Sequence, residues 1–366
     1  LASLVWPLIF AVLLYQLFDP IRSLVESARS RKFTIRVAGN ELSMDEASEQ
    51  QRAMVSDLQA KVAEIERSLK GSHTLALVRS VMNDKQSAEF ERTKECNFAL
   101  SPGDIGRFRV NAFVQQGNVG MVLRLIPSEL PSIDQLKLPE ILKDVAMTKR
   151  GLAILVGATG SGKSTTLAAM LDWRNLHSQG HIVTVEDPIE FVHPHKNCIV
   201  TQREVGLDTD SWEAALKNSL RQAPDVILMG EIRDRETMEH AVAFAETGHL
   251  CLATLHANNS YHALNRILSF YPLETRAALL GDMAAALKAV ISQRLIPGVD
   301  GKRLPAVEVL LNTKLISELI EKSDFSGVRD AMEKAMAEGS QTFEQDLARL
   351  IRSEQISREA GMAFAD

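Results

Sequence analysis

The sequence predicts an α/β fold in which a parallel sheet is covered by crossover helices. From residue 151 onward, short apolar runs alternate with stretches of helical pattern, as in a chain that crosses back over its sheet after each strand. Aromatic residues make up only 5%, while Ala, Leu and Glu are abundant, which favours a helix-rich α/β chain over an all-β one. The 366 residues are 45% hydrophobic, so the chain is long enough for two or three packed domains.

Charge and cysteine content argue against several classes of protein. The 41 basic and 47 acidic residues give a net charge of −6 and are interspersed, so we expect no nucleic-acid partner. Cys96, Cys198 and Cys251 lie far apart and form no CxxC pair. This spacing indicates neither a disulfide framework nor a zinc site, and it fits a reducing cytosol.

The first segment, residues 1–18, carries no charge and approaches the roughly 20 apolar residues that a membrane-spanning helix needs. Asp19 and Pro20 end this run, and five basic residues follow at Arg22, Arg29, Arg31, Lys32 and Arg36. By the positive-inside rule they would place the next segment in the cytoplasm. A secretory signal is the competing interpretation, although the sequence lacks a basic region before the apolar run and a small-residue cleavage pattern.

Residues 19–74 predict two polar helices joined by a connector at 34–43. The second helix carries an apolar stripe at Met54, Leu58, Ile65 and Leu69, which a partner helix could cover. The segment resembles the HAMP linker of membrane receptors, and an ordinary helical hairpin is the alternative.

A change of pattern follows at residues 75–130, where short β-like runs occur at 97–100, 106–114 and 119–126. These runs predict a small α+β domain. The other expected boundaries are a linker with a helix at 131–150, the main α/β domain at 151–298 and a helical region at 299–366.

The strongest motif follows the apolar run 154–156 and satisfies GxxxxGK[ST] ahead of a helix-forming stretch. Its strand, loop and helix context is the one that a phosphate-binding loop requires. Glycines let main-chain amides surround phosphate oxygens, a lysine reaches the β and γ phosphates, and a hydroxyl serves Mg²⁺. The expected nucleotide-binding residues are Gly157, Thr159, Gly160, Ser161, Gly162, Lys163, Ser164 and Thr165.

Two acidic motifs follow apolar runs. The run 225–230 ends at Glu231, a carboxylate that can serve a hard cation directly or through water, or can simply pair with Arg233 or Arg235. The run 182–185 ends in Glu186, Asp187 and Glu190, one of which could accept a proton from a hydrolytic water. Composition does not choose among these three, and a solvated acidic cluster is the alternative.

Two histidines, His249 and His256, flank a further apolar run. Either could contact phosphate, and either could be a hydrogen-bonded core histidine.

With these four motifs in this order, the sequence resembles the secretion ATPases of type II and type IV systems, most closely the pilus retraction ATPases of the PilT/PilU family. The resemblance covers about residues 75–343. It implies a RecA-like P-loop ATPase domain, preceded by a PAS-like α+β domain that is truncated here because residues 1–74 lack the family's opening strands. It also implies ATP and Mg²⁺ as ligands.

By motif position, the resemblance implies that Glu190 is the general base, with Glu186 and Asp187 as support. Glu231 would position the attacking water and, together with Ser164, bind the Mg²⁺ ion. His249 and His256 would contact the nucleotide site.

The resemblance further implies a homo-oligomer, a hexameric ring, in which Arg107, Arg109 and Arg124 of one subunit reach the γ-phosphate bound by the next. Arginine suits this task because its guanidinium spreads charge over several phosphate oxygens. Arginines on strands are often only solvated, which is the alternative. The implied role is a PilU-like motor for pilus retraction and twitching motility, at the cytoplasmic face of the inner membrane, with a platform protein and a PilT-like motor as partners.

Segments 95–99, 221–225 and 339–343 favour the PilU type over the PilT type. Two rival functions stay open. A pilus assembly or type II secretion ATPase usually carries a tetracysteine zinc motif, whereas no cysteine follows Cys251. A membrane-anchored signalling or scaffold protein with a vestigial ATPase domain would be free to lose Lys163, Ser164, Glu190 and Glu231, which are intact.

Overall fold

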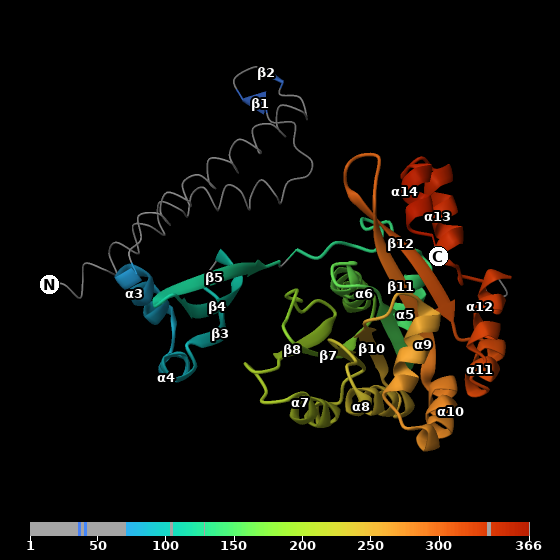
Figure 1. Ribbon diagram of the computed structural model, residues 1–366, viewed down its shortest axis with the longest axis horizontal. Coiled ribbons are helices and arrows are strands. Elements are labelled where there is room, and N and C mark those ends of the chain that lie inside the picture. Colours follow the sequence, from blue (N-terminus) through green and yellow to red (C-terminus); the bar gives the residue numbers. More distant parts are fainter. Residues whose placement is uncertain are drawn as a thin grey trace. The chain divides into compact units, whose positions relative to one another are not determined.

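A computed structural model describes residues 36–37, 40–41, 71–102, 105–127, 129–334 and 338–365. The chain divides into two compact units, Leu1–Leu125 and Ile126–Asp366, and each is described by itself (Figure 1). The expected membrane segment at residues 1–18 and most of the expected hairpin at 19–74 lie outside the described residues. Within the described residues, no helix has the length and apolar character needed to cross a bilayer.

The first unit contains a short antiparallel pair, β1 (Arg36–Val37) with β2 (Asn40–Glu41), and an α+β body. The body consists of α3 (Gly71–Val81), α4 (Asp84–Thr93), β3 (Glu95–Leu100), β4 (Arg107–Gln115) and β5 (Asn118–Ile126), the last strand reaching one residue into the second unit. The strands lie in the order β3-β4-β5 and start and end within two residues of the expected runs. Asn83 caps α4 through a capping box, and Phe90 and Phe98 fill a small core between helices and sheet.

The second unit is built on a seven-stranded sheet with the order β12-β11-β6-β10-β9-β7-β8. Six strands are parallel, and only β12 runs antiparallel, against β11. The strands are β6 (Gly151–Val156), β7 (Gly180–Glu186), β8 (Cys198–Glu204), β9 (Val226–Met229), β10 (Leu250–Leu255), β11 (Leu287–Pro297) and β12 (Arg303–Leu311).

Helices cover both faces of this sheet (Figure 1). One core cluster packs α5 (Ile141–Met147) and α6 (Lys163–His177) on one face. The other face is covered by α7 (Trp212–Ser219), α8 (Arg235–Glu246), α9 (Ser260–Ser269), α10 (Arg276–Ala286), α11 (Lys314–Glu321) and α12 (Phe325–Glu333). Every residue of β6, β9 and β10 is buried, as expected for central parallel strands that read as continuous apolar runs.

The region 299–366 differs from the helical expectation at Arg303–Leu311, which forms the edge strand β12. Alternation was masked here because a seven-residue stretch of this strand is buried on both faces and carries few polar residues. The described residues after this strand form four helices joined by short loops, and α13 (Phe343–Arg352) and α14 (Arg358–Ala363) pack against the ends of β11 and β12.

The parallel order has a direct consequence for the motifs. The carboxyl ends of parallel strands share one edge of a sheet, and β6, β7, β9 and β10 are followed there by Gly157, Asp187, Gly230 and His256. Ligands bind at this edge in open α/β sheets.

Candidate nucleotide-binding site

The loop between β6 and α6 has the conformation that its glycines allow. Gly157, Gly160 and Gly162 have φ of 154°, 79° and 89°, a range that other residues rarely adopt. A Cβ at Gly162 would also lie 2.6 Å from the side-chain amide nitrogen of Gln293, and a Cβ at Gly157 would lie 2.6 Å from the main-chain carbonyl oxygen of Gln293. The glycines therefore serve both backbone conformation and close packing against β11.

Lys163 begins α6 and is 8% exposed. Its ammonium donates to the carbonyls of Gly157 and Ala158 at 2.8 and 2.9 Å, so it lies curled into the loop. Burial lowers the pKa of Lys163, and the negative charge of Glu231 offsets part of that shift.

The other loop residues also fit a phosphate cradle. The Ser161 hydroxyl is buried, and among the described residues it finds no hydrogen-bond partner. Thr159, Gly160 and Ser164 are exposed and Thr165 is half-buried, with Ser164 and Thr165 in the first turn of α6. A helix N-terminus with exposed hydroxyls and a buried lysine matches the needs of polyphosphate and of a divalent cation.

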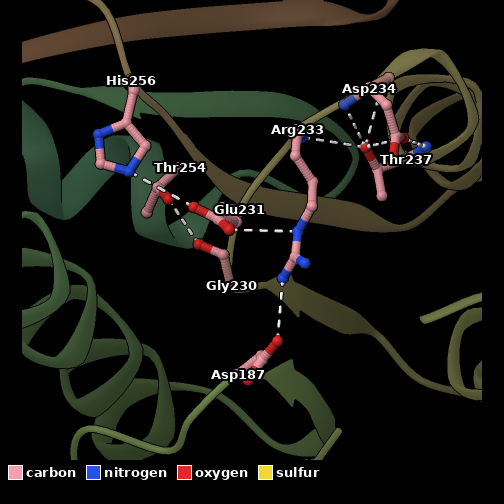
Figure 2. A network of polar contacts seen from close by, with 8 residues as sticks. All are labelled: Asp187, Gly230, Glu231, Arg233, Asp234, Thr237, Thr254 and His256. Carbon is pink, nitrogen blue, oxygen red and sulfur yellow. Dashed lines mark hydrogen bonds and ion pairs between the residues drawn. The ribbon is translucent and has the colours of Figure 1, made fainter. Parts of the chain in front are cut away.

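Glu231 lies between two cationic or protonatable groups (Figure 2). Its two carboxylate oxygens lie 3.2 Å from Arg233 Nε and 3.4 Å from His256 Nε2. Arg233 also donates to Asp187 at 3.1 Å, which links the acidic segment after β7 to the one after β9. Arg235 pairs instead with Glu239 on α8. The expected pairing of Glu231 with a nearby arginine is therefore present, but within a larger network.

A neighbouring tryptophan explains why a glycine, Gly230, follows β9 and precedes Glu231. A Cβ at Gly230 would lie 3.2 Å from the Trp212 ring, and the Gly230 carbonyl accepts a 2.5 Å hydrogen bond from the Thr254 hydroxyl. The Arg233 guanidinium lies 4.9 Å from the centre of the same ring. Trp212 and Thr254 thus fix the chain that carries Glu231. Neither residue was predicted: Trp212 stands in no recognisable motif, and Thr254 lies in the apolar run between His249 and His256, where only the histidines were singled out.

The three carboxylates at the end of β7 and just after it have different environments. Glu186 accepts from the Thr184 hydroxyl at 2.7 Å, from the Gln202 amide at 3.2 Å and from the main chain of Glu190. Burial raises the pKa of Glu186, and these hydrogen bonds lower it in part. Asp187 is held by Arg233, whereas Glu190 is exposed.

The two histidines lie at opposite ends of β10, so within one chain only His256 shares the sheet edge with the phosphate-binding loop. His249 precedes the strand, where its carbonyl accepts from the Gly151 amide at the start of β6. Its ring nitrogen lies 3.1 Å from the Phe244 carbonyl and 3.0 Å from the Thr247 hydroxyl. A six-residue strand spans about 20 Å.

The three expected arginines belong to the first unit. Arg107 and Arg109 are half-buried on β4, and Arg124 is exposed on β5. The Arg107 Nε atom is buried, and no partner for it occurs among the described residues.

Gln293 on β11 is a further residue that sequence analysis missed. It contacts the phosphate-binding loop, as the glycine geometry shows. The available signal was the polar pair Ser292-Gln293 within an otherwise apolar strand beside β6.

A parallel sheet flanked by helices, a glycine loop with its lysine, and carboxylates after two neighbouring strands together define a P-loop nucleotide-binding protein. Residues 50–349 match the family described as type II/IV secretion system protein. The type IV pilus ATPase PilU of Pseudomonas aeruginosa is 56% identical over 81% of this chain and 78% of its own length. PilT of the same organism is 43% identical over 78% of this chain and 83% of its own length.

Solved structures agree with these relatives. The pilus retraction motor PilT with bound ADP aligns with a TM-score of 0.75 and 40% identity, over 80% of this chain and 83% of that one. DotB of Legionella pneumophila aligns with a TM-score of 0.66 and 26% identity, over 81% and 84%. The chain therefore belongs to the type II/IV secretion system protein family, within its pilus retraction ATPases.

This membership confirms the expected fold class and the expected ATPase of the PilT/PilU type. The rival assembly ATPases are more distant: PilB of Acinetobacter baylyi is 36% identical over 51% of this chain and 32% of its own length.

Proposed function

We propose that the second unit hydrolyses Mg²⁺-bound ATP and that the free energy drives pilus retraction at the cytoplasmic face of the inner membrane. The observation that carries this proposal is the arrangement of Glu231, which lies between Arg233 and His256 after β9, the second strand along the sheet from the one that ends in the phosphate-binding loop with Lys163. Ser164 and Glu231 would hold Mg²⁺, the latter directly or through water. When bound, the ion would neutralise charge that develops on the phosphate oxygens.

Burial and hydrogen bonding suggest separate roles for the acidic residues. Glu186 is held by three donors, which suits a residue that orients the segment after β7. Glu190 is exposed and its main chain is anchored by Glu186, so its carboxylate can turn toward a water molecule and accept a proton. Glu231 would orient that water together with His256.

The first unit would complete the site of another subunit. We propose that Arg107, Arg109 and Arg124 act across an interface of a ring, where guanidinium groups stabilise the charge of the transferring phosphoryl group. A PilT-like motor and a platform protein in the membrane are the proposed partners of this ring.

The catalytic assignment is tested with Glu190→Gln and Glu186→Gln as a matched pair. Glu190→Gln should keep ATP bound while turnover falls by roughly 10²-fold or more, the usual scale for loss of a positioned base. Glu186→Gln preserves most hydrogen bonds and should lower turnover less. Steady-state phosphate release and fluorescent-ATP binding measure the two quantities. If Glu186→Gln proves to be the inactive variant and Glu190→Gln is near normal, the roles are reversed.

Shared sites are tested by mixing two inactive variants. Arg124→Ala subunits lack the proposed donor, and Lys163→Ala subunits lack a functional phosphate-binding loop. Hybrid rings contain interfaces with an intact loop and an intact arginine, so mixing should recover part of the ATPase activity. A fully active monomer would contradict the ring.

A further inference from the structure

Gln293 is almost completely buried, at 3% exposure, in the middle of β11. A side-chain amide in such a place is costly unless both its donor and its acceptor are satisfied. Its carbonyl oxygen accepts from the Thr166 hydroxyl at 2.7 Å, and its amide nitrogen donates to the Ser161 carbonyl at 2.8 Å. One side chain thus connects the second turn of α6 with the loop that precedes it.

The bond to Ser161 fixes the direction of one peptide group. The Ser161–Gly162 peptide is trans, because among the described residues only Asp187–Pro188 is cis. In a trans peptide the carbonyl and the following N–H point in opposite directions. With the Ser161 carbonyl directed at Gln293, the Gly162 N–H is therefore directed away from β11.

Such control matters at this peptide because Gly162 has φ of 89° and lacks a Cβ that would restrict rotation. The main-chain N–H groups of a phosphate-binding loop are its phosphate ligands. A peptide that rotates toward another orientation would present a carbonyl oxygen in place of a donor and would repel an anion.

We infer that Gln293 is a positioning residue for the phosphate cradle: it orients the Ser161–Gly162 peptide so that the Gly162 N–H is preorganised for the phosphates of a bound nucleotide. The inference rests on the proposed nucleotide site and adds a residue from outside the four motifs. Thr166 has the supporting role, since its hydroxyl holds the Gln293 carbonyl oxygen and so determines which way the amide faces.

The test compares Gln293→Leu with Gln341→Leu in the full chain. Gln341 is the matched control, because its amide donates to the Val307 carbonyl at 2.7 Å and Val307 is the register partner of Gln293 in the β11–β12 pair. Gln341 does not contact the loop. Gln293→Leu loses the hydrogen bond to the Ser161 carbonyl and the one from the Thr166 hydroxyl, whereas Gln341→Leu loses the hydrogen bond to the Val307 carbonyl of β12. Both variants remove a glutamine amide that donates to main chain, but only Gln293 donates to the cradle.

Binding of a fluorescent ADP, and its displacement by inorganic pyrophosphate, are measured for both variants. Gln293→Leu should weaken both affinities by about tenfold, the effect of one well-placed hydrogen bond. Gln341→Leu should change them by less than about twofold while lowering the melting temperature. If pyrophosphate and ADP lose affinity by the same factor, the defect lies at the phosphates. A purely structural role for Gln293 would not produce this pattern.

A second pair covers the case in which Gln293→Leu does not fold. Thr166→Val removes the hydroxyl that orients Gln293 and should weaken ADP binding, whereas Thr166→Ser retains the hydroxyl and should restore it. Wild-type affinity in Gln293→Leu or Thr166→Val, or an equal loss in Gln341→Leu, would overturn the inference. A wild-type chain that binds ADP but does not hydrolyse ATP would contradict the proposed function and leave the role of Gln293 standing.

Discussion

The two units of the chain differ in how completely they bury their sheets. In the second unit β6, β9 and β10 are buried throughout, with helices on both faces. In the first unit β5 is one of the two outer strands of the described sheet, and its Val122, Leu123 and Leu125 are 56%, 46% and 49% exposed. The second unit thus encloses its core on both faces and carries the phosphate-binding loop, whereas the first presents exposed apolar side chains and Arg124 on one strand.

The largest expected effects come from two substitutions, one in the phosphate-binding loop of the second unit and one at an arginine of the first unit that is proposed to act on another subunit. Lys163→Ala removes the ammonium of the phosphate cradle and should abolish both nucleotide binding and hydrolysis. Arg124→Ala in the first unit should leave binding intact and reduce turnover by roughly 10³-fold, the scale reported for arginines that act on a transferring phosphoryl group. Equilibrium binding and phosphate release measure both. Unchanged nucleotide affinity in Lys163→Ala would contradict the assignment of the loop.

A pH effect on stability should come from His193 in the second unit. Burial lowers the pKa of His193 from 6.5 to about 4, with smaller effects of Asp172 and Lys196. Between these values the unfolded chain binds a proton that the folded chain does not, so stability is complete above pH 6.5 and falls as the pH drops toward 4. The loss approaches about 3 kcal/mol.

Urea unfolding followed by tryptophan fluorescence would measure this loss in a Trp6→Phe background, since the other two tryptophans, Trp173 and Trp212, both lie in the second unit. His193→Gln should flatten the pH dependence between 6.5 and 4 by about one proton. An equally steep dependence in that variant would show that other groups are responsible.

A positive charge introduced on β5 of the first unit should weaken self-association of the protein. Leu123→Lys or Leu125→Lys places an ammonium where apolar contact is available, which forfeits about 1.5 kcal/mol or more of burial. We expect association to weaken about tenfold in sedimentation experiments. Leu273→Lys is the control in the second unit, because Leu273 is 76% exposed but lies outside any strand. Equal effects of all three would remove the distinction between the units.

The smallest expected effect is on stability and comes from the loss of a helix N-cap in each unit. Asn83 caps α4 and Ser211 caps α7, and both are exposed. Replacement of either by Ala should cost about 1 kcal/mol. Because a small domain has a small unfolding entropy, the melting temperature should drop by about 4–8 °C for the transition of the first unit and by about 2–4 °C for the second. Calorimetry would resolve the two shifts, and a larger shift for Ser211→Ala would reverse the expected order.

Much of the second unit could be predicted because its motifs follow buried strands, and parallel order brings strand ends together without further information. The phosphate-binding loop, Glu231 and the segment after Glu186 are of this kind. Gln293, Trp212 and Thr254 could not be found, since their roles depend on which strands and helices become neighbours. The position of His249 could not be predicted for the same reason. The six residues of β10 lie between His249 and His256, so the two histidines stand at opposite ends of that strand. The strand at Arg303–Leu311 was missed because it is buried on both faces and so lacks the alternation of apolar and polar residues that marks a half-buried strand.

All three cysteines of the chain are buried, at Cys96, Cys198 and Cys251, and burial raises the pKa of each thiol. Since the thiolate is the form that reacts with maleimides, the native thiols should label slowly. A single cysteine introduced at an exposed position such as Ile199, which is 63% exposed, would then be the dominant site of dye attachment. The fold thus allows energy-transfer measurements between subunits without first removing any native residue.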